Sequence, residues 1–149
     1  MAISSRFAVA VHVLVLLERG GGEPVPSERI AASVGTNPAV IRRILCMLSR
    51  AGLTRSRLGT GGGAMLARAA GEVTLLDVYR AVEDGELFVL HAGDEHCPVG
   101  RHIEGVLEEA VGAARRAMEE SLAKRTLADV CSRVRTRCGE RGAAVPGEV

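Results

Sequence analysis

Two helix boundaries separated by three residues restrict the fold of this 149-residue chain more than any other feature. Ser27 is a suitable N-cap for a short helix, and Gly35 is a suitable residue to end it. Asn37 followed by Pro38 marks the start of a second helix, because a proline in the first turn sacrifices no hydrogen bond. The spacing predicts a helix-turn-helix.

The second predicted helix has two chemically different faces. Its apolar face carries, at helical spacing, Ile41, Ile44, Leu45 and Leu48. The opposite face carries Ala39, Arg42, Arg43, Cys46 and Arg50. Such a helix can enter the major groove of DNA, where arginine donates to guanine O6 and N7. Candidates for base-edge contacts are therefore Arg42 and Arg43, with Asn37, Ala39 and Cys46 on the same surface.

The charges are segregated along the chain. Seven arginines and no acidic residue lie between Arg29 and Gly71, although the whole chain has a net charge of only +1. A merely solvated surface is expected to mix acids with arginines, so this pattern favours a polyanionic partner. We predict double-stranded DNA, and an acidic protein is the alternative. Between Glu72 and Glu109 ten acids accompany two arginines, and this part is expected to face away from the phosphates.

A β-hairpin is predicted directly after the second helix. Residues 53–58 alternate apolar and basic, GTGGG forms a tip, and residues 64–67 return as the second strand. A hairpin in this position is a wing, which can approach the minor groove. Arg50, Arg55 and Arg57 are candidates for phosphate contacts. The glycines are not expected to bind a nucleotide, because no Lys-Ser/Thr follows them and they do not open a helix.

Several ordered motifs resemble one family of bacterial proteins. In order, they are SSRFAVAVHVLVLL, TNPAVIRRIL, RAGLTRSRLGTGGGAMLA, VTLLDVYRAVE and HCPVGRHI. They resemble the BadM/Rrf-two family of winged-helix transcription regulators, and most closely its YwnA-like branch. The resemblance implies a homodimeric DNA-binding regulator, usually a repressor, with Ser5 and Arg6 near the DNA backbone; Ser27 is a further candidate contact. Ala64 departs from the pattern, since many members carry an aromatic residue there, which bears on the contacts of the wing tip.

The predicted fold is mainly helical with a small β-hairpin wing and a long C-terminal dimerisation helix. Its parts are a winged helix-turn-helix domain at 1–82, a sensor loop with dimerisation helices at 83–138, and a flexible tail at 139–149. The long helix, from about Pro98 to Lys124, has an apolar stripe that one small domain cannot easily bury. A homodimer is therefore predicted, and a stripe folded back on its own domain is the alternative.

Cys97 is the candidate sensing residue. It lies at the start of the long helix, where N–H groups and a cationic His96 would both favour the thiolate. We predict a response to oxidants or electrophiles, and an inert, partly buried thiol is the alternative. Iron–sulfur-sensing relatives carry three cysteines in this loop, whereas this chain has only Cys97 there, so no metal or cofactor is predicted. His12 and the His91–His102 segment could bind a metal, but a core histidine and a solvated loop are the preferred interpretations.

Composition excludes several other functions. Only three aromatic residues occur, which argues against stacking on single-stranded nucleic acid. No nucleophile elbow or cofactor motif is visible, so an enzyme is not expected. The four cysteines form no CxxC pair, as expected for a protein of the reducing cytoplasm. The apolar run in the first helix is too short to span a bilayer and lacks a signal-peptide cleavage pattern.

Overall fold

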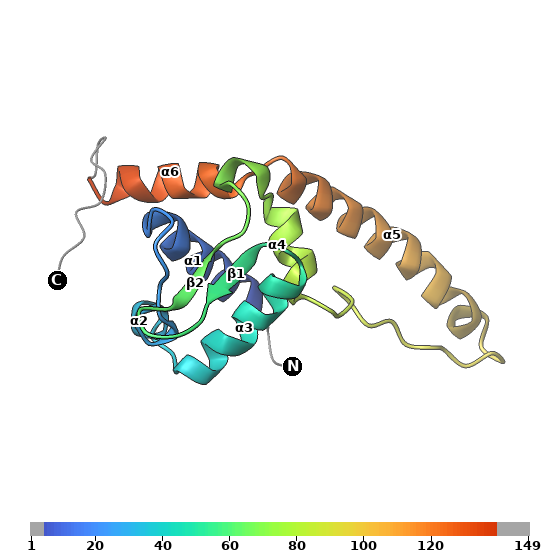
Figure 1. Ribbon diagram of the computed structural model, residues 1–149. Coiled ribbons are helices and arrows are strands. Elements are labelled where there is room, and N and C mark those ends of the chain that lie inside the picture. The colour runs from blue at the N-terminus through green and yellow to red at the C-terminus, as the bar shows by residue number, and fades with distance from the viewer. Residues whose placement is uncertain (1–4, 140–149) are drawn as a thin grey trace.

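The computed structural model describes residues 5–139, and the tail predicted beyond Gly139 lies outside the described residues (Figure 1). The elements are α1 (Arg6–Arg19), α2 (Ser27–Val34), α3 (Pro38–Arg50), β1 (Thr54–Arg57), β2 (Gly63–Leu66), the short 3-10 helix η1 (Ala70–Glu72), α4 (Leu75–Val82), α5 (Pro98–Ala123) and α6 (Leu127–Arg137). The predicted fold, mainly helical with one hairpin and a long helix near the C-terminus, is confirmed.

The predicted helix-turn-helix is formed by α2 and α3. Gly35 ends α2 in the left-handed conformation, with a φ of 77°. The Asn37 side chain caps α3 by accepting a hydrogen bond of 3.1 Å from the N–H of Val40. The expectation that Ser27 caps α2 is wrong, because the helix already begins at Ser27. Pro26 occupies the N-cap position with extended backbone angles and provides no side-chain cap.

The hairpin has a third partner that the sequence did not reveal. β1 and β2 are antiparallel, from Thr54 opposite Leu66 to the pair next to the tip. Val25 then pairs with Ala64 through two backbone hydrogen bonds of 2.9 Å. At Gly63 a Cβ would lie 2.5 Å from backbone atoms of Val25, so this close approach requires glycine. Ala64 lies within β2 and is buried, and the effect of its departure from the family pattern on the wing-tip contacts stays a prediction.

The hydrophobic core is built around α1. This helix contributes fully buried side chains and packs against α2, α3, α4, α6 and β2. α6 belongs to the same core, because Leu127 and Cys131 are buried together with the residues of α1. The start of α6 is joined to the segment before α4, since the N–H of Leu127 donates to the carbonyl of Val73 at 2.8 Å. The final helix therefore packs with the first 82 residues rather than with α5.

α5 projects from this core and differs from the other long helices (Figure 1). None of its 26 residues is buried. It is joined to the core through α4, where the guanidinium of Arg80 lies 3.1 Å from the carboxylate of Glu119. Within residues 5–139, no helix is long and apolar enough to cross a membrane.

Candidate nucleic-acid interface

α3 presents one face to the core and the other to solvent. Ile41, Ile44 and Leu48 are buried, and Leu45 packs partly against them. The side chains on the opposite face are exposed at Ala39, Arg42, Arg43, Cys46 and Arg50. The division into two faces is the one that the sequence pattern predicted. It leaves the basic face of α3 accessible to a ligand.

The arginines of the acid-free segment differ in their pairing. Arg42 is bound by Glu28 of α2, with 2.7 Å between Nη2 and Oε1. Arg68 donates to the carbonyl of Glu72 at 2.5 Å and lies 3.9 Å from Asp77. In the described part of the chain no ion pair is formed by Arg43, Arg50, Arg55 or Arg57, which are all exposed. These four arginines, together with Arg42, are called the basic surface below.

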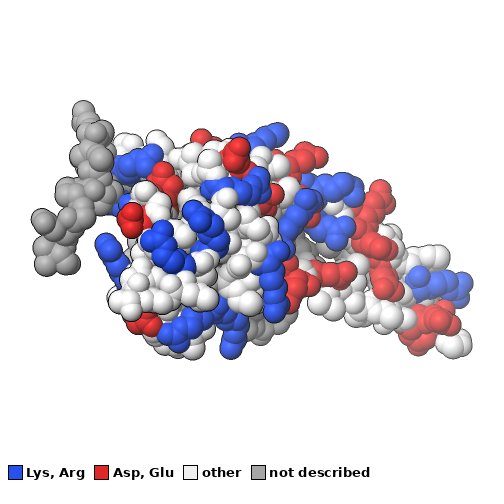
Figure 2. Space-filling view, in the orientation of Figure 1, with Lys and Arg blue, Asp and Glu red and all other residues white. Residues whose placement is uncertain are grey.

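The basic surface belongs to a larger separation of charge over the molecule. Figure 2 shows mostly basic side chains over the helix-turn-helix and hairpin, while acidic side chains are more frequent toward α5, where they alternate with basic ones. This matches the reversal of charge that the sequence shows after Glu72. A polyanion would therefore be attracted to the helix-turn-helix end of the molecule.

A hollow connects α3 to the hairpin. It has a volume of about 340 Å³ and is lined by Arg42, Leu45, Cys46, Ser49, Arg50 and Ser56. Side chains alternate along a strand, so Arg55 and Arg57 lie on the face of β1 opposite to Ser56. The hollow brings together Arg42, Cys46 and Arg50 of the predicted DNA-binding set, whereas the two arginines of β1 lie on another side of the wing.

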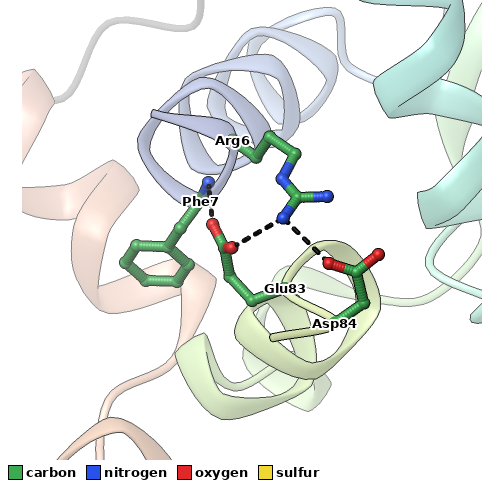
Figure 3. Close-up of polar contacts among 4 residues, drawn as sticks. All are labelled: Arg6, Phe7, Glu83 and Asp84. Carbon is green, nitrogen blue, oxygen red and sulfur yellow. Dashed lines mark hydrogen bonds and ion pairs between the residues drawn. The ribbon is translucent and has the colours of Figure 1, made fainter. Parts of the chain in front are cut away.

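Arg6 is engaged by acidic residues at the end of α4 (Figure 3). Its Nη2 lies 3.2 Å from Glu83 Oε2 and 2.9 Å from Asp84 Oδ1. Glu83 also accepts a hydrogen bond of 3.3 Å from the N–H of Phe7. The Arg6 hydrogen bond is the main reason why the pKa of Asp84 lies below its ordinary value. A phosphate contact by Arg6 stays a prediction, and it requires the guanidinium to share or leave these carboxylates. Ser5 beside it is exposed.

Cys97 occupies the N-cap position of α5 with an exposed thiol. The backbone N–H groups of Gly100 and Val99, in the first turn of α5, lower its pKa. His96 does not contribute to this shift, and its ring nitrogen Nδ1 lies 3.1 Å from Asp94 Oδ1. The thiol is thus neither partly buried nor activated by histidine. The N–H groups at the start of α5 are the groups that lower its pKa.

The described residues do not fit a metal ion or cluster held by one chain. Between residues 5 and 139 no group of three or more histidine, cysteine or acidic side chains is arranged to hold a metal. The interpretation of His12 as a core histidine is wrong. It is exposed, and its Nε2 lies 3.1 Å from the hydroxyl of Ser33.

Sequence reasoning missed Glu28. This residue immediately precedes the acid-free segment, and the sequence pattern did not indicate that it would lie beside Arg42. The only available signal was its position in the first turn of α2, because α2 and α3 pack against each other across a short turn.

A two-helix unit with a short turn, an exposed basic second helix and a hairpin after it define a winged helix-turn-helix DNA-binding protein. The chain belongs to the Rrf2 family, whose model, described as an iron-dependent transcriptional regulator, matches residues 3–133. It is therefore a DNA-binding transcriptional regulator. The expectation that it is not an enzyme is confirmed by this family membership.

Individual relatives agree with this assignment. Over 130 residues the chain is 44% identical to Bacillus subtilis YwnA, named as an HTH-type transcriptional regulator, with 86% of this chain and 96% of YwnA covered. A crystal structure described as a DNA binding protein has a TM-score of 0.68 at 40% identity, covering 85% of this chain and 98% of its own. CymR (YrzC), the global cysteine regulator of B. subtilis, shares the fold with a TM-score of 0.67 at 23% identity. The match covers 89% of this chain and 97% of the CymR chain.

Proposed function

We propose that this regulator is a homodimeric repressor that occupies an operator with two copies of α3. The observation that carries the proposal is the uncovered apolar stripe of α5. Val106 is 62% exposed and Leu107 is 37% exposed, although helices of this length normally bury one face. A second copy of the chain is the proposed cover, because a two-fold protein suits half-sites one helical turn apart.

The proposed DNA contacts divide into two groups. Arg42 and Arg43 address base edges, with Asn37, Ala39 and Cys46 at the same surface. The DNA backbone is contacted by Ser5, Arg6, Ser27, Arg50, Arg55 and Arg57. Exposure of the basic surface supports this division, and phosphate contacts fix the register in which base edges are read. Repression follows because an occupied operator is closed to other proteins.

Cys97 is proposed as the sensor of oxidants or electrophiles in the cytoplasm. Its exposure and its lowered pKa support a reactive thiolate. The loop between α4 and α5 carries this residue, so modification there would change how α5 is set against the core. In a dimer, such a change would alter the spacing between the two α3 helices.

Selection of bound duplexes from a random pool, with and without oxidant, tests these proposals together. We expect palindromic duplexes from the unmodified protein and loss of binding after oxidation. Cys97→Ser should bind the same duplexes and keep them in oxidant. Selected duplexes without two-fold symmetry, or an equal response of Cys97→Ser to oxidant, would contradict the dimer or the sensor respectively.

Three further measurements separate the alternatives. Val106→Glu should convert the dimer into a folded monomer in light scattering, and Leu58→Glu, at a wing position that is 91% exposed, should remain a dimer. The family description allows an iron-dependent regulator, for which protein purified without air would be coloured and contain iron. If binding favours no particular duplex and resists salt, the basic surface serves an acidic protein instead.

A further inference from the structure

The contact between Glu28 and Arg42 places an acidic side chain on the surface that faces DNA. Glu28 lies in the first turn of α2, and Arg42 lies in the second turn of α3. Their 2.7 Å contact joins the two helices across the turn at Gly35–Asn37. The acid therefore stands beside the arginine that we assign to a base edge.

Stability does not explain this contact. The side chains of Glu28 and Arg42 are 64% and 62% exposed, and ion pairs between exposed side chains contribute little to folding. A negative charge at this position also weakens the attraction of the basic surface for phosphates. Its effect on DNA binding is thus unfavourable unless it improves the contact that Arg42 makes.

The geometry provides such an improvement. A guanidinium has five N–H donors in one plane, and Glu28 uses a donor of Nη2. The remaining donors suffice for a bidentate contact with guanine. A carboxylate held on one side restricts the rotation of Arg42, which would otherwise be free to bind any nearby phosphate.

Glu28 is itself held in the charged form. The backbone N–H of its own residue, and then the guanidinium of Arg42, keep the pKa of Glu28 below its ordinary value. The first turn of a helix also favours a negative side chain.

We propose that Glu28 is a positioning residue for sequence recognition, which orients the Arg42 guanidinium toward a base edge and lowers binding to unrelated DNA. The inference rests on the proposed base contact of Arg42. It predicts that removal of Glu28 strengthens binding to random duplexes and weakens discrimination between random and selected ones.

The test compares variants of the full chain on a duplex selected by the wild type and on a random duplex. Glu28→Ala should bind the random duplex more tightly, and the ratio of the two dissociation constants should fall about fivefold or more. Glu28→Gln has the same net charge as Glu28→Ala but keeps an acceptor for Arg42. It should therefore retain more of the wild-type ratio. Glu23→Ala removes an exposed acid of the preceding loop and should leave the ratio unchanged.

Three outcomes would overturn the inference. Equal ratios for Glu28→Ala and Glu28→Gln would show an effect of charge alone. A ratio unchanged from wild type in Glu28→Ala would show that the contact orients nothing that DNA recognition uses. An effect of Glu28→Ala that persists in an Arg42→Ala background would mean that Glu28 acts on a base directly. The proposed function fails separately, if Arg42→Ala by itself leaves base preference unchanged.

Discussion

Replacing Arg57 by alanine tests how the basic surface meets DNA and how many copies of it bind. Arg57 is the last residue of β1, is exposed, and forms no ion pair within residues 5–139. Each phosphate that a protein neutralises changes the slope of log K against log salt by about 0.9. A dimer loses two such contacts in Arg57→Ala, so the slope should become less steep by about 1.8.

The assay is a titration of DNA binding between low and physiological salt, on selected and random duplexes. Because the Arg57 contact reads no base, both duplexes should lose affinity to the same extent. Arg68→Ala is the matched control. It also removes one arginine of the acid-free segment, but its guanidinium is held by Glu72 and Asp77, and the slope should stay unchanged.

The outcomes are distinct. A slope equal to that of the wild type would refute the phosphate contact of the wing. A change of about 0.9 would keep the contact and refute the binding of two copies. A loss confined to the selected duplex would reassign Arg57 to a base edge.

Other predictions concern the recognition helix, the sensor and the core. Arg43→Ala should weaken binding and relax the preference at one base-pair position by about 1–3 kcal/mol, measured by competition among single-base variants of the selected duplex; an equal loss on random DNA would contradict it. Iodoacetamide should alkylate Cys97 at a lower pH than an ordinary thiol, because its thiolate forms earlier, while Cys131, with a pKa of about 11, stays unmodified near pH 8; mass spectrometry checks both, and preferential labelling of Cys131 would refute the assignment. Leu127→Ala should lower the free energy of unfolding by about 2–5 kcal/mol in urea, whereas Leu58→Ala should change it by less than about 0.5 kcal/mol, and similar values for the two would contradict the packing of α6 into the core.

Much of the fold was predictable because its signals are local. Asn37, Thr74 and Thr126 cap their helices through side chains that bond to backbone groups three residues away. The two faces of α3 likewise follow from helical periodicity alone. At Ser27 the local signal failed by one residue, because Pro26 already allowed the helix to begin.

The sequence by itself determined most helix boundaries, the basic face of α3 and the long apolar stripe of α5, since each depends on residues within a few turns of one another. Only the tertiary structure decided that α6 joins the core of α1, that Arg6 meets Glu83 and that Glu28 meets Arg42. The two ion pairs join residues 77 and 14 positions apart in the chain, and helix packing brings their side chains together. Their contacts depend on the relative placement of whole elements, which no local pattern specifies.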